Sequence, residues 1–224
     1  MRIVFDLDGT LVDSTPTLLA TINTVLAEHN LAPSNQDENH RYAGHGLFSM
    51  FDSTIRSRVP DWEEKQRTVL VQEMLADYSQ RSTIGNVVYE GVPSLLEALQ
   101  QKGFKLCIIS NKLSSLTKAI VANSFPTIRF EHIYGEDSGF APKPDPGSLN
   151  QCRTLLKDQE PLIYVGDTEI DYETARNAKV TVYLATWGYR GKKTLLSYGI
   201  AEHLLIAHPM QLVCMIEQHK ERTV

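Results

Sequence analysis

Short apolar runs alternate with helical patterns along most of the chain. The runs are continuous and rich in β-branched residues, which is typical of strands covered on both faces of a parallel sheet. They lie at 3–5, 104–109, 162–165 and 180–184. Apolar residues recur at helical spacing over 92–99, 113–121 and 149–156. The alternation predicts an α/β fold, a Rossmann-like open parallel sheet flanked by helices and joined by right-handed crossovers.

One segment interrupts this alternation. From Ser14 to Ile84 the sequence contains no run typical of a strand, only amphipathic helical patterns and a charged stretch at 61–81. About 70 residues is near the smallest size at which a unit keeps a core of its own. We therefore predict an α/β core formed by residues 1–13 and 85–224, with an all-helical cap, 14–84, inserted after the first strand.

Composition and charge narrow the class of protein. The 224 residues are 42% hydrophobic and 22% charged, which is ordinary for a globular protein and enough for one large domain with a smaller one. The formal net charge of −5 argues against nucleic acid as a partner, because nucleic-acid binders need a basic surface to offset backbone phosphates. An anionic ligand must then be met by local positive charge or by a metal.

Apolar run length and cysteine spacing bear on location. No apolar stretch approaches the ~20 residues that a membrane span needs, so we expect no membrane partner. Three cysteines lie far apart without CxxC spacing, at Cys107, Cys152 and Cys214. This usage favours a reducing setting over a disulfide scaffold or a zinc site. We expect a cytoplasmic, unanchored protein.

Two carboxylates follow the first apolar run, in the stretch FDLDGTL at 5–11. Side chains two residues apart in an extended segment point to the same side, so Asp6 and Asp8 can converge on one site beyond the strand. Open α/β sheets bind ligands at the carboxyl ends of their strands. The same residues are also typical of a turn, because Asp and Gly are common turn formers.

Polar residues also follow the second run. Ser110 and Asn111 are typical helix N-caps, and a helix N-terminus with free backbone donors also suits a phosphate oxygen. Lys143 lies between two prolines in APKPDP at 141–146. The prolines restrict the backbone and would fix the direction of the ammonium. The alternative is a solvated surface charge, as most lysines are. A fixed cation beside carboxylates suits phosphoryl chemistry.

Two more carboxylates lie in VGDTEID at 165–171. As a helix start, this stretch offers Asp167 or Thr168 as an N-cap and Asp171 as a favourable charge near the helix dipole. Alternatively, these carboxylates join Asp6 and Asp8 at one edge of the sheet. Clustered carboxylates repel one another unless a cation lies among them, and the hard, oxygen-seeking Mg²⁺ fits that role. In the second interpretation the cluster predicts a magnesium site.

Together these motifs, in this order, resemble the motif set of the haloacid dehalogenase superfamily. The resemblance spans the whole chain, and the helical insertion after Asp13 is similar to the cap that this superfamily places there. Within the superfamily the chain is most similar to the phosphoglycolate phosphatases. That likeness rests on FDLDGTLVDS at 5–14, GHG at 44–46, APKPDP at 141–146 and ATWGY at 185–189.

The resemblance implies a role for each motif residue. Asp6 would be the nucleophile that forms an aspartyl phosphate, and Asp8 would protonate the leaving group and then activate water. Mg²⁺ would be held by Asp6, the backbone carbonyl of Asp8 and Asp167, with Asp171 acting directly, through water or behind the ligands. The phosphoryl oxygens would be bound by Ser110, Asn111 and Lys143.

The cap would set substrate choice by closing over the site. Its candidate recognition loop lies at 41–46. There Arg41 or His45 would meet a substrate carboxylate, and Gly44 would allow close approach of the backbone. A solvated turn between two helices is the alternative for each of these residues.

The expected function is Mg²⁺-dependent hydrolysis of a small phosphorylated metabolite, with 2-phosphoglycolate as the leading substrate, in a monomer or homodimer. A sugar-phosphate phosphatase, a pyrophosphatase or a hexose-phosphate mutase would use the same machinery. A non-catalytic phosphate-binding protein is the alternative from a different class.

Overall fold

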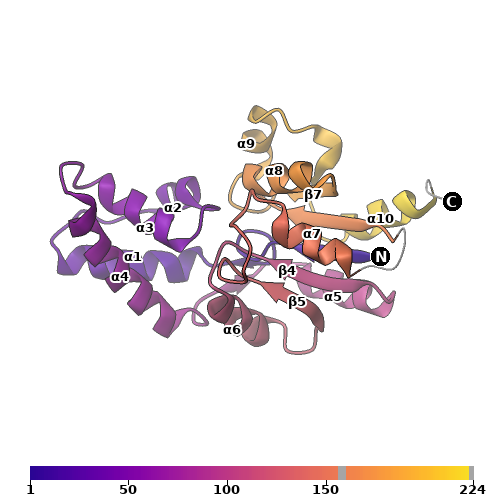
Figure 1. Ribbon diagram of the computed structural model, residues 1–224, viewed down its shortest axis with the longest axis horizontal. Coiled ribbons are helices and arrows are strands. Elements are labelled where there is room, and N and C mark those ends of the chain that lie inside the picture. The colour runs from indigo at the N-terminus through magenta and orange to yellow at the C-terminus, as the bar shows by residue number, and fades with distance from the viewer. Residues whose placement is uncertain (156–159, 222–224) are drawn as a thin grey trace. The chain divides into compact units, whose positions relative to one another are not determined.

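The computed structural model describes residues 1–155 and 160–221, and the chain divides into two compact units (Figure 1). The first unit comprises Met1–Asp13 and Val88–Val224, and the second comprises Ser14–Val87. The second unit begins at the residue where the predicted cap begins and ends at Val87 rather than at Ile84. Two short strands, β2 (Val12–Asp13) and β3 (Val87–Val88), lie where the chain leaves and re-enters the first unit.

A six-stranded sheet forms the centre of the first unit, with the order β5-β4-β1-β6-β7-β8 and parallel pairing throughout. Its strands are β1 (Arg2–Phe5), β4 (Lys105–Ile109), β5 (Phe130–Tyr134), β6 (Leu162–Gly166), β7 (Thr181–Ala185) and β8 (Leu205–Ile206). The four strands predicted from the apolar runs are the four inner ones. The predicted fold class is therefore confirmed.

Both faces of this sheet are covered by helices, as the continuous apolar runs predicted. Val4 belongs to the apolar cluster on one face, whereas Ile3 and Phe5 belong to the cluster on the other. The first face packs against α7 (Gly147–Thr154), α8 (Glu169–Ala178) and α9 (Gly191–Ser197). The second packs against α5 (Val92–Gln101), α6 (Ser114–Ser124) and α10 (Gln211–Glu221) (Figure 1). A three-residue 3₁₀ helix, η1 (Glu202–Leu204), precedes β8.

The outer strands and helix ends add detail to this picture. β5 carries polar residues between its apolar ones and all five are half-buried, and β8 has only two residues, so neither forms an apolar run. Gly103, after α5, has a φ of 76°, the left-handed conformation that is common where a helix ends. The third helical pattern was predicted to continue to Leu156, which lies outside the described residues.

The second unit is helical and has an apolar core of its own. Its helices are α1 (Thr15–Glu28), α2 (Gln36–Tyr42), α3 (Leu47–Arg56) and α4 (Glu64–Arg81). Their buried side chains include Leu18, Ile22, Phe51, Ile55, Val71, Met74 and Tyr78. Among the residues that the structure describes, none of the helices combines the length and the apolar character that a bilayer crossing requires.

An ion pair fastens the loop after α3 to α2 in this unit. The Arg58 guanidinium binds both carboxylate oxygens of Glu38, at 2.8 and 2.7 Å, and also donates to the carbonyl oxygen of Pro33 at 2.9 Å. The hydroxyls of Ser34 and Ser57 donate to the same carboxylate. The hydrogen bonds from Arg58 lower the pKa of Glu38 to about 2, against the opposing effect of partial burial.

We predict that Glu38→Gln lowers the melting temperature near neutral pH and that this deficit shrinks in acid. The unfolded chain titrates Glu38 near pH 4.5 and the folded chain near 2, so the stabilisation is complete above 4.5 and is lost as the pH falls toward 2. Thermal unfolding of both proteins at pH 6 and pH 3 measures the difference. An equal deficit at both values would contradict this assignment.

Candidate active site

The predicted site residues follow the carboxyl ends of three neighbouring strands. Asp6 follows β1, Ser110 follows β4 and Asp167 follows β6. The backbone N–H of Asp6 donates to the carbonyl oxygen of Val165 at 2.8 Å, and so the ladder between β1 and β6 continues to the site. The sheet itself therefore fixes the separation of Asp6 and Asp167.

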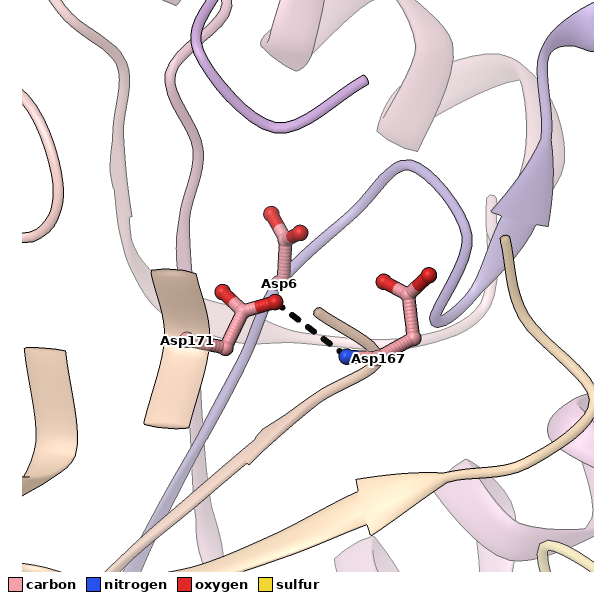
Figure 2. Close-up of side chains that lie close together, drawn as sticks. All are labelled: Asp6, Asp167 and Asp171. Atoms are coloured by element: carbon pink, nitrogen blue, oxygen red, sulfur yellow. Dashed lines mark hydrogen bonds between the residues drawn. The ribbon is translucent and has the colours of Figure 1, made fainter. Parts of the chain in front are cut away.

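Three carboxylates meet at this edge. Asp6, Asp167 and Asp171 each place an oxygen within 4.8 Å of the others, and all three side chains are buried (Figure 2). Asp6 comes from the end of β1, Asp167 from the end of β6 and Asp171 from the first turn of α8. Both interpretations of VGDTEID hold: Thr168 is the N-cap of α8 with Asp171 in its first turn, and Asp167 and Asp171 join Asp6 at one edge of the sheet.

A buried lysine binds two of the three carboxylates. The Nζ atom of Lys143 lies 2.7 Å from Oδ1 of Asp171 and 3.0 Å from Oδ1 of Asp6, and the lysine side chain is only 3% exposed. It also donates to the hydroxyl of Tyr164 at 3.2 Å. A buried ammonium is costly unless it is paired and hydrogen-bonded, and these partners meet that requirement. Lys143 is thus part of the site, not a solvated surface charge.

The pKa values of this pair reflect burial and charge. Burial raises the pKa of Asp6 to about 7, the Lys143 ammonium opposes that rise, and the carboxylates of Asp171 and Asp8 add to it. Burial alone would lower the pKa of Lys143, but the charges of Asp171 and Asp6 outweigh burial and raise it. Lys143 therefore stays protonated and stabilises the ionised form of its carboxylate partners.

Asp171 differs from the other two carboxylates because hydrogen-bond donors surround it. Its Oδ1 accepts from Lys143 and from the hydroxyl of Tyr164, at 2.7 and 2.8 Å. Its Oδ2 accepts from the hydroxyl and the backbone N–H of Thr168, at 2.8 and 3.1 Å. The same atom accepts from the backbone N–H of Asp167 at 3.2 Å (Figure 2). Burial alone would raise the pKa of Asp171, but Lys143 and these hydrogen bonds lower it. A carboxylate has about four lone-pair positions, so little capacity remains for another ligand.

Asp167 has a different environment. Its carboxylate accepts from the Thr10 hydroxyl at 3.1 Å and from the backbone N–H of Tyr189 at 2.8 Å. Burial, Asp171 and Asp6 raise its pKa well above the ordinary range. Within residues 1–155 and 160–221, no lysine or arginine forms an ion pair with it. Asp167 is therefore the member of the cluster that most needs a cation.

The donor set fits a hard divalent cation. The groups that face one another are carboxylate oxygens, which Mg²⁺ prefers, and their negative charge exceeds what one lysine offsets.

The backbone comes close to Asp167 at two glycines. A Cβ at Gly188 would lie 2.5 Å from Oδ2 of Asp167, and one at Gly9 would lie 2.6 Å from its carboxyl carbon. Both distances are shorter than real Cβ contacts, so only glycine leaves Asp167 in this position.

The second acid of FDLDGTL lies beside the cluster. Asp8 is partly exposed, its carboxylate is not one of the three clustered groups, and Lys112 Nζ lies 2.7 Å from its Oδ1. Ser110 accepts from the backbone N–H of Lys112 at 3.2 Å. The Asn111 side chain exchanges two hydrogen bonds with the backbone of Lys143, at 2.7 and 3.0 Å, and so fixes the loop that carries this lysine.

Several contributing residues were not singled out from the sequence. Lys112 directly follows Ser110 and Asn111, but a lysine after a helix-cap pattern carries no signal of its own. Tyr164 lies inside the apolar run LIYV, where it was interpreted as a strand residue. Thr10 lies in the first motif, next to Gly9, and only the fold brings its hydroxyl to Asp167.

The residues predicted to recognise substrate belong to the helical unit. Arg41 lies in the last turn of α2, and Gly44 and His45 lie in the turn before α3. Arg41 and His45 are exposed, and Gly44 has a φ of 104°, a conformation that favours glycine. In the ATWGY stretch of the first unit, the Trp187 indole donates to the carbonyl oxygen of Thr10 at 3.1 Å.

Comparison with known proteins places these motifs in a family. The family model described as haloacid dehalogenase-like hydrolase matches residues 3–185. The chain is 31% identical over 221 residues to a phosphoglycolate phosphatase from Aquifex aeolicus, covering 98% of each chain. It is 32% identical over 188 residues to one from Rhodobacter capsulatus, covering 84% of this chain and 85% of that relative.

Solved structures agree with this result. A protein from Lactobacillus delbrueckii subsp. bulgaricus matches with a TM-score of 0.86 over 94% of this chain and 95% of its own, and its 22% identity makes it evidence of the fold alone. A haloacid dehalogenase-like hydrolase from Streptococcus pneumoniae matches with a TM-score of 0.76 and 26% identity, over 96% and 97% of the two chains. The resemblance inferred from the motifs is confirmed. The chain belongs to the haloacid dehalogenase-like hydrolase family.

Proposed function

We propose that this protein is a Mg²⁺-dependent phosphatase that transfers the phosphoryl group of a small monoester to Asp6 and then to water. One observation carries the proposal: a buried ammonium, Lys143, binds both Asp6 and Asp171 beside Asp167, at the carboxyl ends of β1 and β6. A carboxylate nucleophile beside a fixed cation and a metal-binding carboxylate is the arrangement that phosphoryl transfer requires.

Asp6 is oriented for attack by donors to one of its oxygens. The backbone N–H of Leu7 donates to Oδ1 at 2.7 Å, and Lys143 binds the same atom. We therefore assign Oδ2 to the attack on phosphorus. As the new bond to phosphorus forms, the bond to the ester oxygen breaks, and the leaving oxygen takes a proton from Asp8. Asp8 then accepts a proton from the water that hydrolyses the acyl phosphate, which releases phosphate and restores Asp6.

Asp6, Asp167 and the backbone carbonyl of Asp8 would hold Mg²⁺. When bound, the ion supplies positive charge that offsets these carboxylates and the phosphoryl oxygens. We assign Asp171 to a different task, holding Lys143, because five hydrogen bonds already occupy its oxygens. Ser110, the backbone N–H of Asn111 and Lys143 are assigned to the phosphoryl oxygens.

The substrate we favour is 2-phosphoglycolate. Support comes from the relatives at 31% and 32% identity, which are named phosphoglycolate phosphatases. Such a substrate has a carboxylate besides its phosphate, and Arg41 and His45 on the helical unit are the candidates to meet it. The roles of these two residues rest on their chemistry and on their positions, Arg41 in the last turn of α2 and His45 in the turn before α3.

Asp6→Asn should reduce phosphate release from 2-phosphoglycolate by about 1,000-fold or more, because an amide is a poor nucleophile. Release of inorganic phosphate in the presence of MgCl₂ measures the loss. Asp61→Asn, which makes the same chemical change at an exposed position of the helical unit, should retain full activity. Substantial activity in a folded Asp6→Asn protein would remove Asp6 from the role of nucleophile.

A substrate panel tests the proposed substrate class. With Mg²⁺, we expect kcat/KM for 2-phosphoglycolate to exceed the values for hexose phosphates and pyrophosphate, and activity to disappear when a chelator removes the ion. Free phosphate is the readout. A faster hexose phosphate or pyrophosphate would favour the corresponding phosphatase, isomerised sugar phosphate without phosphate release would favour a mutase, and no turnover on any compound would favour a binding protein.

Asp167→Asn and Asp171→Asn should separate metal binding from lysine positioning. Asp167→Asn removes a metal ligand. The Mg²⁺ concentration that gives half-maximal activity should therefore be about 10-fold higher for Asp167→Asn than for Asp171→Asn. Asp171→Asn should instead lower kcat at saturating Mg²⁺, because Lys143 loses its shorter ion pair. Mg²⁺ titrations of activity measure both effects, and equal shifts in the Mg²⁺ requirement would make Asp171 a direct ligand.

A further inference from the structure

We propose that Lys112 is a positioning residue, whose ammonium binds Oδ1 of the Asp8 carboxyl group and holds it in the orientation from which Oδ2 delivers its proton. The proposal rests on the phosphatase function above and concerns a residue that none of the sequence motifs identified. It assigns a separate cation to each half of the reaction centre: Lys143 to the nucleophile Asp6, and Lys112 to the proton donor Asp8.

The ion pair is a built feature of the site. Lys112 Nζ lies 2.7 Å from Oδ1 of Asp8, and the lysine side chain is 3% exposed whereas that of Asp8 is 20% exposed. Removing an ammonium from water is costly unless a close counter-charge compensates it. A surface lysine would pay no such cost, so burial of Lys112 points to a defined task for its head group.

The backbone of Lys112 is held on both sides. Its N–H donates to the hydroxyl oxygen of Ser110 at 3.2 Å, and its carbonyl oxygen accepts from the N–H of Glu136 at 3.0 Å. Gly135, next to Glu136, makes this approach possible, because a Cβ there would overlap the carbonyl oxygen of Lys112. The ammonium is therefore presented to Asp8 from a fixed point.

Orientation matters for a proton donor such as Asp8. A proton donor acts only when its oxygen lies within hydrogen-bond reach of the leaving atom, and misplacement of a reacting group is costly in rate. The bond from Lys112 fixes the position of Oδ1 of Asp8, whose side chain is 20% exposed. In the proposed step, Asp6 Oδ2 forms its bond to phosphorus, the bond from phosphorus to the ester oxygen breaks, and the proton on Oδ2 of Asp8 moves to that oxygen, which leaves an Asp8 carboxylate paired with Lys112.

The test compares two phosphate esters in a Lys112→Met variant, which keeps side-chain length and removes the charge. The alkoxide of 2-phosphoglycolate needs a proton to leave, whereas 4-nitrophenolate is a stable anion that leaves without one. We expect kcat/KM for 2-phosphoglycolate to fall by about 10-fold or more, and kcat/KM for 4-nitrophenyl phosphate to fall by less than about 3-fold. This parameter reports the steps up to phosphorylation of Asp6.

Three controls accompany this variant. In an Asp8→Asn background, Lys112→Met should cause no further loss on 2-phosphoglycolate, because the group that it orients is absent. Lys118→Met, which removes an exposed lysine of α6, should leave both kcat/KM values unchanged. Thermal unfolding checks the fold, and Lys112→Gln replaces Lys112→Met if the methionine variant does not fold.

The outcomes separate this inference from the proposed function. Equal losses on both esters would overturn the inference, since they would mean that Lys112 acts on the phosphoryl group or on the fold rather than through Asp8. A further loss from Lys112→Met in the Asp8→Asn background would also overturn it. Absence of turnover by the wild-type protein on every ester would instead overturn the phosphatase function itself.

Discussion

The buried bridge from Lys143 to Asp6 and Asp171 is the interaction on which the rest of the site depends. An ammonium that is 3% exposed is tolerated only because two carboxylates and a phenol surround it, and each partner comes from a different segment of the chain. Asp6 follows β1, Tyr164 belongs to β6, and Asp171 lies in the first turn of α8. The side chain of Asn111, after β4, holds the backbone of the lysine. The bridge therefore ties four segments together at the carboxyl edge of the sheet.

Charge at this edge is distributed unevenly. Asp171 shares Lys143 with Asp6, and Asp8 has Lys112. Asp167 accepts from a hydroxyl and a backbone N–H, and among the described residues it has no lysine or arginine in an ion pair. A phosphate ester brings further negative charge into this region. Positive charge beyond the two lysines is needed before substrate and carboxylates can be close together, and Asp167 is where that need is greatest. The uneven distribution supports the proposal that Asp171 serves a lysine and Asp167 a metal.

The sequence predicted the framework of this site better than its contacts. Continuous apolar runs identify the four inner strands, and the rule that ligands bind at the carboxyl ends of strands brings Asp6, Ser110 and Asp167 together without coordinates. Partners across the site depend on side-chain direction and on loops, which no periodicity describes. Tyr164 illustrates this limit, because it looks like any apolar strand residue until its hydroxyl is seen to bind Asp171. The edge strand β5 was not predicted, because its residues are half-buried and mixed in polarity and so form no apolar run.

The glycines of these motifs make room for the buried aspartates. Gly9 and Gly188 leave no room for a side chain beside Asp167, and a Cβ at Gly166 would overlap the side chain of Asp171. The carboxylates can be buried close to one another only because the backbone itself comes this near, supplying N–H donors where side chains would otherwise intrude. Gly9 is thus more than the turn residue that its DG sequence indicates, because it lets the backbone after β1 approach the Asp167 side chain. The motifs place glycines close to acids in the sequence because this packing requires both.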